Sequence, residues 1–329
     1  MANQTEVLRL LMRTAPDYCS GDQLANELQI SRTAIWKLVQ GLQNTGYSIE
    51  SRHGRGYRYV ENNQLSATVI ETGLQLADPV QLIVLPTVDS TNAYLKRLAT
   101  RAPLTAPVVV VADTQTAGYG RSGREFYSPG QTGIYLSIGL PVTPQEPLNP
   151  GLLTTGTAVA VAQTLQQLFD VPVELKWVND VLVNHHKVVG ILSEGMTNLE
   201  TGQISSVVVG IGINLTTAAF PSPIEHKAGA VTNRQTPVTR NQVIQRLLNT
   251  FFNGYPTYRT GDFMPAYRQL SMVIGQQVAL KSGHSTYHGV VNDVDATGAL
   301  VVELTDGTTQ HFSSGEITKV NLLTGPYQG

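Results

Sequence analysis

The stretch Gln115-Thr-Ala-Gly-Tyr-Gly-Arg-Ser-Gly-Arg124 follows a run of apolar residues at 108–112. The apolar run predicts a buried strand, so this stretch, the glycine loop, stands at the end of that strand. Its three glycines let backbone amides come close to a bound group, and its two arginines suit a phosphate or a carboxylate. We expect an anion-binding loop that becomes ordered around its ligand, with a merely flexible basic loop as the alternative.

The spacing of the glycine loop excludes two common nucleotide motifs. It lacks the Gly-Lys-Ser/Thr of a P-loop, and no helix pattern follows directly, as the dinucleotide fingerprint requires.

Strand and helix patterns alternate on both sides of the glycine loop. Strands are predicted at residues 80–85, 108–112, 134–140, 173–177, 181–184, 187–194 and 207–215, and helices at 91–99 and 151–169. Neighbouring short strands predict antiparallel hairpins, so a mixed sheet is expected rather than a doubly wound parallel one. The fold class that follows is α+β, with a central mixed β-sheet that carries helices on one face.

A second polar segment, Asp89-Ser-Thr-Asn92, stands between a predicted strand and a predicted helix. The hydroxyl of Ser90 or Thr91 can cap that helix. The same hydroxyls can hold a polar ligand at the N-terminus of the helix. Capping alone is the competing interpretation.

A third segment, Lys176-Trp-Val-Asn-Asp180, places Asn179 and Asp180 at the end of another strand, where ligands collect in such sheets. Lys187 opens the next strand and is expected to reach the same cleft. Gly210-Ile-Gly-Ile-Asn214 ends a further strand with small residues and an amide.

The first sixty residues predict three helices and a hairpin. A capping-box pattern at Ser20 and Gln23 begins the second helix. Ser31 begins the third, whose apolar residues from Ile35 to Leu42 share one face. Helix, turn and helix followed by a basic hairpin is typical of a winged helix-turn-helix.

This arrangement predicts DNA binding, with a protein-interaction or spacer module as the alternative. Base contacts are expected from Arg32, Thr33, Trp36 and Lys37 on the third helix, and phosphate contacts from Arg52, Arg55 and Arg58 on the hairpin.

The last part of the chain, from about residue 274, contains short strand patterns separated by turn residues such as those at 295–298 and 306–307. They predict a small SH3-like β-barrel. The expected domains are therefore 1–62, the winged helix-turn-helix; 63–273, the central domain; and 274–329, the C-terminal domain.

Composition narrows the possible classes. The 329 residues carry a net charge of −2, so bulk charge does not recruit polyanions, although residues 1–60 hold seven Lys and Arg against five Asp and Glu. Cys19 is the single cysteine, which excludes an internal disulfide and fits a cytoplasmic protein. No signal peptide or membrane span is predicted.

The adjacent His185 and His186 suggest a metal pair, but consecutive strand residues face opposite ways, which favours their being turn residues.

Together these segments resemble the biotin protein ligases, specifically the bifunctional type that also represses biotin-synthesis genes. The likeness spans nearly the whole chain and rests on residues 89–92, 115–124, 176–180, 187–192 and 210–214, which occur in the family's order. Tyr119 and Ser122 replace two arginines that are common in the family, which puts a phosphate role at those positions in doubt. Phe126 stands where tryptophan is common.

The resemblance implies a set of site residues. Biotin contacts are implied for Ser90, Thr91, Asn92, Gln115, Tyr119, Gly120, Arg121 and Lys187, and ATP contacts for Gly118, Arg121, Asn179, Asp180, Asn214 and Gly315. Charge neutralisation during catalysis falls to Arg121, Arg124 and Lys187. Asp180 is the candidate ligand for Mg²⁺, with capping of a loop as its alternative role.

The implied activity is ATP-dependent ligation of biotin, through biotinyl-5′-AMP, to a lysine of a carrier protein, as in biotin–[acetyl-CoA-carboxylase] ligases. Biotin, ATP and Mg²⁺ are the implied small molecules. The implied partners are a biotin carboxyl carrier domain, operator DNA and, once biotinyl-AMP is bound, a second copy of the chain. The alternatives are a ligase with a non-functional winged domain, a biotin-sensing repressor without turnover, and a lipoate ligase on a related scaffold.

Overall fold

The structure is a computed structural model that describes residues 3–143, 145, 148–197, 202–233, 236–322 and 325–327. It divides into two compact units. The front unit comprises Met1–Leu74 together with Pro237–Gln245, and the main unit comprises Gln75–Thr236 together with Arg246–Gly329. Helix α7 (Arg240–Gly254) therefore has its first residues in the front unit and the rest in the main unit.

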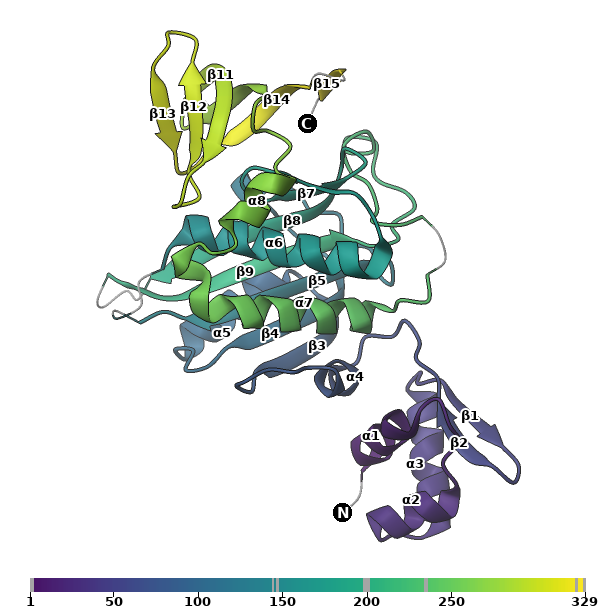
Figure 1. Ribbon diagram of the computed structural model, residues 1–329. Coiled ribbons are helices and arrows are strands. Elements are labelled where there is room, and N and C mark those ends of the chain that lie inside the picture. The colour runs from purple at the N-terminus through teal and green to yellow at the C-terminus, as the bar shows by residue number, and fades with distance from the viewer. Residues whose placement is uncertain are drawn as a thin grey trace. The chain divides into compact units, whose positions relative to one another are not determined.

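The front unit contains the predicted three helices and hairpin (Figure 1). In order, its elements are α1 (Gln4–Thr14), α2 (Gly21–Leu28), α3 (Arg32–Asn44), β1 (Ile49–Arg52), β2 (Gly56–Tyr59) and α4 (Ala67–Thr72). The predicted capping box at Ser20 and Gln23 is present, and Ser31 caps α3. Apolar side chains from all three leading helices and the hairpin form one core, which fixes the exposed face of α3.

Residues 61–66 are hydrogen-bonded within the front unit to residues from much later in the chain. Asn241 Nδ2 donates to Gln64 O over 2.8 Å, and Arg240 Nη2 donates to Asn63 O over 2.7 Å. Arg240 is only 2% exposed. The start of α7 is thus part of the front unit, although each of these bonds joins residues that are 177 positions apart in the sequence.

The main unit is built on a seven-stranded sheet of order β3-β4-β5-β9-β8-β7-β6. Its strands are β3 (Gln81–Val88), β4 (Val108–Gln115), β5 (Gly133–Pro141), β6 (Val173–Lys176), β7 (Asp180–Val183), β8 (His186–Thr197) and β9 (Ile204–Asn214). Strands β3 and β4 are parallel, and the other neighbours are antiparallel. The predicted mixed sheet is confirmed.

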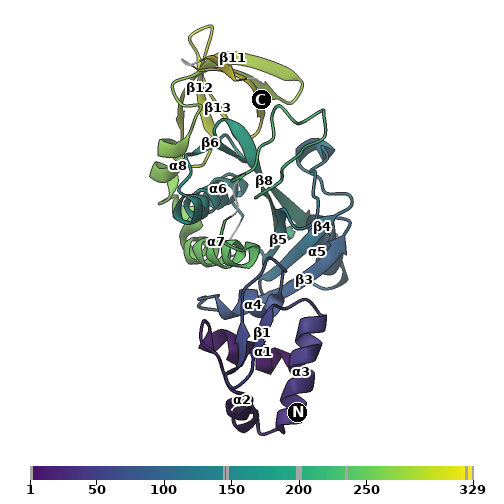
Figure 2. The ribbon, with the colours of Figure 1, turned by 90° about the vertical axis from the view of Figure 1, so that its right-hand side faces the viewer.

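The prediction that helices cover one face of this sheet is wrong. The Thr154 hydroxyl of α6 (Pro150–Phe169) lies 3.0 Å from Ser193 Oγ of β8. Ser193 pairs with Val209, whereas the next residue of β9, Val208, packs with Leu95 of α5 (Thr91–Arg101). Because consecutive strand residues face opposite ways, α5 and α6 cover opposite faces, as Figure 2 shows. The continuous burial of 108–112 in β4 has this cause: both of its faces are covered.

Three further elements lie between residues 240 and 270, a stretch for which the sequence suggested none. They are α7, the 3₁₀ helix η2 (Tyr255–Thr260) and α8 (Met264–Leu270). Figure 1 places α7 beside α6 on the same side of the sheet.

The tail forms a six-stranded antiparallel sheet of order β13-β12-β11-β10-β14-β15. Its strands are β10 (Gln277–Ser282), β11 (Ser285–Val294), β12 (Leu300–Leu304), β13 (Thr309–Phe312), β14 (Glu316–Leu322) and β15 (Gly325–Tyr327). Four of these were predicted, and β14 and β15 were not. A β-rich C-terminal region is therefore confirmed.

Two local predictions need correction. Asp180 begins β7 rather than ending a strand, since β6 stops at Lys176. The turn between β7 and β8 is Asn184-His185, both with positive φ (51° and 61°), and His186 is already in β8. These are the backbone angles that two-residue hairpins favour.

Candidate functional site

The N-terminus of α5 is a buried polar cluster. Ser90 caps the helix by accepting from the Ala93 amide over 3.4 Å. The Thr91 amide and hydroxyl both point at Gln115 Oε1, at 2.9 and 3.2 Å. Ser137 Oγ of β5 lies 2.7 Å from Thr91 Oγ1 and 2.5 Å from Asn92 Oδ1. Capping therefore occupies only Ser90, and Thr91 and Asn92 join a network that includes the glycine loop.

Gln115 connects this cluster to the far side of the glycine loop. Its Nε2 donates to Ser128 Oγ over 2.9 Å, and that hydroxyl donates to Phe126 O over 2.8 Å. A Cβ at Gly118 would lie 2.7–2.8 Å from Gln115 Nε2, Phe126 O and Ser128 Oγ. The loop closes here at a distance that only glycine allows.

The loop itself is a compact turn held by its own backbone. The Gly120 amide donates to Arg124 O over 2.7 Å, and the Phe126 amide donates to Gly118 O over 2.8 Å. The Phe126 ring covers Gly212, where an added Cβ would come within 2.5 Å of it. Gly212 thus makes room for the loop's own aromatic ring, whereas Gly210 makes room for the Asn92 side chain.

Each of the three predicted catalytic cations already has a partner. Arg121 Nη1 donates to Gly315 O over 2.9 Å and to Asn179 Oδ1 over 3.3 Å. Arg124 forms a two-pronged ion pair with Glu316, at 2.6 and 2.5 Å. Lys187 Nζ lies 2.5 Å from Asp180 Oδ1. The fold therefore gathers residues from the loop, from β7 and β8, and from the C-terminal sheet.

Electrostatics around these cations follows from their pairing. The Arg124 guanidinium holds the pKa of the Glu316 carboxyl below its usual range. Lys176, at 7% exposure, has its pKa lowered because burial disfavours the charged ammonium, and the nearby Lys187 adds to this effect.

Asn214 ends β9 with an amide oxygen that is buried and has no hydrogen-bond partner among the described residues. An unsatisfied buried acceptor is costly, so this position suits a donor supplied by a ligand.

Sequence reasoning missed several residues that shape the site. They are Lys96 and Ser137 in the helix and strand behind the loop, Ser128 after the loop and Glu194 on β8. Ser137 stands in the otherwise apolar strand β5, and Glu194 pairs with the apolar Val208. A polar residue at such a position is the signal that could have found them.

Metal-ligand clusters are not part of the site. The described residues include no group of three or more His, Cys, Asp or Glu side chains placed to hold a metal ion. His185 instead pairs with Glu174 at 2.8 Å, and the His186 ring bonds to Asn184 O. Within the same residues, no helix combines the length and apolar content needed to cross a membrane.

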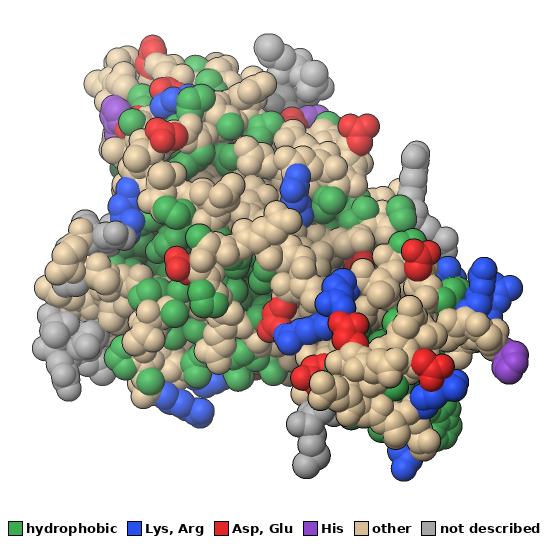
Figure 3. Space-filling model, turned by 60° about the horizontal axis from the view of Figure 1, so that its bottom comes forward, with side chains coloured by type: hydrophobic (Ala, Val, Ile, Leu, Met, Phe, Trp, Pro, Cys, Tyr) green, Lys and Arg blue, Asp and Glu red, His purple; other side chains and the backbone are tan. Residues whose placement is uncertain are grey.

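The exposed face of α3 carries the four residues predicted to read bases. Arg32, Thr33, Trp36 and Lys37 are all exposed, and Trp36, at 53%, is one of the large hydrophobic side chains most open to solvent in the described chain. An exposed aromatic side chain beside cations suits contact with bases. On the face shown in Figure 3, Lys and Arg side chains form small separate groups, several beside acidic ones.

The three hairpin arginines are not equivalent. Arg52 and Arg55 are exposed. Arg58 instead lies 2.6 Å from Glu50 and 4.9 Å above the Tyr18 ring, and Tyr18 donates to the same carboxylate over 2.8 Å. The hydrogen bonds from Tyr18 and Arg58 hold the pKa of Glu50 below its usual range. Arg58 braces the base of the hairpin.

Comparison with family models finds three matches along the chain. Residues 84–214 match the "Biotin/lipoate A/B protein ligase family", residues 3–58 match an "HTH domain" and residues 273–320 match the "Biotin protein ligase C terminal domain".

Relatives and solved structures agree with these models. The chain is 32% identical to a "Bifunctional ligase/repressor BirA" of Bacillus spizizenii over 94% of the chain and 96% of that protein. It is 30% identical to that of Escherichia coli over 97% and 98%. A biotin protein ligase from Aquifex aeolicus, solved in complex with biotin and ATP, matches 72% of the chain and 97% of its own length at 26% identity and a TM-score of 0.59.

Proposed function

This chain belongs to the family of bifunctional ligase/repressor (BirA) proteins, and we propose that it joins biotin to a carrier-protein lysine and represses genes in response to biotin. The observation that carries the ligase half is the joining of a buried polar cluster at α5, through Gln115, to a glycine loop that carries Arg121 and Arg124, with Lys187 of β8 nearby. The repressor half rests on the exposed face of α3 and the basic hairpin.

Biotin is proposed to bind at the N-terminus of α5. Its ureido group needs both donors and acceptors, and Ser90, Thr91 and Gln115 offer both. Asn92 and Tyr119 would line the same end of the site. The biotin carboxylate would then reach the Gly120 amide and Arg121.

The nucleotide is proposed to lie between the glycine loop and the C-terminal sheet. Gly118, Arg121, Asn179, Asp180, Asn214 and Gly315 are the proposed contacts. Two facts support this: Arg121 and Gly315 already touch, and the unsatisfied Asn214 oxygen suits a donor from the ligand.

The proposed reaction has two steps. A carboxylate oxygen of biotin attacks the α-phosphorus of ATP and pyrophosphate leaves, which gives biotinyl-5′-AMP. A neutral lysine amine of the carrier then attacks the acyl carbon, AMP leaves and the amine gives up a proton. The protein's part is positioning and charge neutralisation, since Arg121, Arg124 and Lys187 stand where negative charge gathers.

Magnesium is proposed to enter with ATP rather than to reside in the protein. Mg²⁺ is commonly held by one or two carboxylates together with substrate phosphates. Asp180, the candidate from the sequence, has Oδ1 committed to Lys187 at 2.5 Å. The described side chains alone do not offer enough ligands for the ion, so the phosphates of ATP would supply the rest.

Three finer features also belong to this proposal. The C-terminal sheet would be an SH3-like barrel, the domains would divide near residues 62 and 273, and the protein would act in the cytoplasm, where carrier and operator are both present. The repressor would bind its operator as a dimer, because a symmetric operator needs two recognition helices.

The ligase is tested by mass spectrometry of a biotin carboxyl carrier domain incubated with the full chain, MgATP and biotin. Biotinylated carrier is the expected product, and its absence in the presence of bound biotin would indicate a sensor without turnover. Lipoate in place of biotin is the control against a lipoate ligase.

The repressor is tested by sedimentation of the full chain with and without biotin and ATP, which measures its oligomeric state. Its affinity for DNA from the upstream region of biotin genes is then measured at a fixed salt concentration. Biotinyl-AMP is expected to favour the dimer by stabilising one conformer of the glycine loop. A monomer unchanged at micromolar concentration contradicts this mechanism, and a dimer that ignores the DNA indicates a non-functional winged domain.

A further inference from the structure

Glu194 is a carboxylate on the face of β8 that α5 covers, where strand neighbours are apolar. It pairs across β9 with Val208, a residue of the core beneath α5. A charge at such a place is costly unless donors surround it. The structure supplies three donors from two separate segments.

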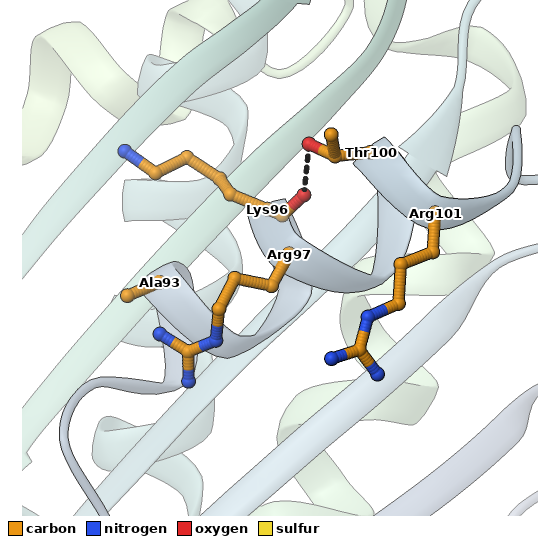
Figure 4. Close-up of a pocket in the computed structure, with 5 residues that line it drawn as sticks. All are labelled: Ala93, Lys96, Arg97, Thr100 and Arg101. Carbon is orange, nitrogen blue, oxygen red and sulfur yellow. Dashed lines mark hydrogen bonds between the residues drawn. The ribbon is translucent and has the colours of Figure 1, made fainter.

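The first two donors come from α5. Asn92 Nδ2 donates to Glu194 Oε2 over 2.9 Å, and Lys96 Nζ donates to Oε1 over 2.8 Å. Figure 4 shows that Lys96 leaves the helix in another direction from Arg97 and Arg101. Arg97 is engaged with Asp89, at 2.6 and 2.8 Å. Lys96 is therefore directed at Glu194 rather than being part of one basic surface.

The third donor comes from the glycine loop. The Tyr119 hydroxyl donates to Glu194 Oε2 over 2.9 Å, and Lys96 Nζ lies 5.4 Å from the centre of the Tyr119 ring. Burial alone would raise the pKa of Glu194, but hydrogen bonds from Lys96, Asn92 and Tyr119 outweigh it and lower that pKa. The carboxylate is thus charged at neutral pH and holds all three donors.

The same loop is fixed at its start by backbone bonds. The Thr116 amide donates to Val88 O over 2.9 Å, and the Ala117 amide donates to Asp89 O over 2.8 Å. With Tyr119 tied to β8, residues 116–119 are anchored to the sheet before any ligand arrives. The later half has backbone bonds within the loop, and the side chains of Arg121 and Arg124 join it to the C-terminal region.

We propose that Glu194 is a positioning residue of the biotin site, which fixes the Asn92 amide and the Tyr119 ring together while Lys96 balances its charge. The inference rests on the proposed biotin site. It gives Tyr119, which stands where arginine is common in the family, a role of its own: its hydroxyl links the glycine loop to β8. Biotin then meets a half-loop that is already built, and only residues 121–124 change partners when the nucleotide enters.

The test measures KM for biotin, KM for ATP and kcat of biotinyl-AMP formation in the full chain. Tyr119→Phe removes one hydroxyl, and Glu194→Gln removes the charge that holds Lys96. Each is expected to raise the biotin KM about tenfold, the size of one lost hydrogen bond to a charged group at a half-exposed site, with the ATP KM unchanged. The double variant is expected to be no worse than Glu194→Gln alone, because the two residues share one interaction.

Arg101→Ala, on the same helix but outside the cluster, is the matched control and is expected to behave like the unaltered chain. Equal increases in both KM values, with a lower melting temperature, would indicate a purely structural role and overturn the proposal. So would a biotin KM that stays within twofold in both variants.

An independent measurement separates this inference from the ligase function. Amide hydrogen exchange of residues 116–120 in the ligand-free protein is expected to be faster in Tyr119→Phe than in the unaltered chain. If the unaltered chain forms no biotinyl-AMP, the function fails and this exchange still tests the anchor. Unchanged exchange overturns the anchor even in an active enzyme.

Discussion

The hairpin of the front unit and the glycine loop of the main unit both present arginines around glycine-containing turns, but they hold those cations differently. On the hairpin, Arg52 and Arg55 are exposed, whereas Arg58 is paired with Glu50. At the glycine loop, Arg121, Arg124 and nearby Lys187 all have partners within the chain. A surface that meets phosphates by diffusion can leave its cations free, whereas a site that closes around an anion has to exchange internal partners for the ligand.

The largest effect that would sharpen this comparison is expected from Arg121→Ala. Arg121 is held by two neutral oxygens, so a phosphate or carboxylate should displace them readily. Its removal is expected to slow biotinyl-AMP formation by about 10²-fold or more, the usual cost of deleting one group that stabilises developing charge. Pyrophosphate release measures the effect. A loss below threefold would mean that Arg121 does not meet the reacting groups.

Matched glycine substitutions compare the two turns directly. In Gly118→Ala the new methyl would meet three atoms at 2.7–2.8 Å, whereas at Gly54 it meets nothing within 4 Å but has to adopt a φ of +73°. We expect Gly118→Ala to cost about 1–3 kcal/mol and to weaken biotin binding. Gly54→Ala should cost about 1–2 kcal/mol without affecting biotin. Thermal melting and biotin titration of both variants decide between these expectations, and equal biotin affinities contradict them.

The salt dependence of DNA binding is expected to distinguish Arg55 from Arg58. Arg55→Ala is expected to reduce the slope of log binding constant against log salt by about 1, because a phosphate contact is lost. Arg58→Ala should leave the slope nearly unchanged and lower the melting temperature of the front unit, since Arg58 is bonded to Glu50. DNA titrations of both variants at four salt concentrations measure the two slopes, and thermal melting measures the stability of the front unit. Identical slopes for the two variants would remove the distinction between free and braced cations.

The smallest effect is expected from the pH dependence of the Arg124–Glu316 ion pair at the glycine loop. Arg124 lowers the pKa of Glu316, so the folded state holds that proton less tightly than the unfolded state. The pair therefore adds stability above the ordinary pKa of glutamate and loses it as pH falls through the lower folded value. Because both side chains are substantially exposed, at 65% and 40%, the gain is well under about 1 kcal/mol. The free energy of unfolding of Glu316→Gln should differ from that of the unaltered chain at pH 7, and the difference should shrink as the pH falls through the lowered pKa of Glu316.

Much of the fold followed from local patterns. The caps at Ser20, Ser31 and Ser90 lie where hydroxyls precede apolar periodicity, and the structure confirms them. The prediction of helices on one face was wrong because alternation does not tell which face a helix will cover. The buried run at 108–112 carried that information, since a strand without alternation has both faces covered.

The site could be predicted only in part, for a related reason. Ser90, Thr91 and Gln115 were found because they stand at element ends, and the structure brings them together. Glu194 was not found because its role depends on which strand lies beneath α5 and the glycine loop, a pairing that no spacing in the sequence expresses.

The bonds between residues 61–66 and the start of α7 have a consequence for synthesis of the chain. The apolar core of the front unit uses residues 7–69 and can form early. The partners of Asn63 and Gln64, however, are Arg240 and Asn241. At about 5–20 residues per second, a ribosome delivers them roughly ten to forty seconds later. During that interval the front unit lacks the hydrogen bonds from Arg240 and Asn241 to Asn63 and Gln64. These bonds can form only after most of the main unit has been translated.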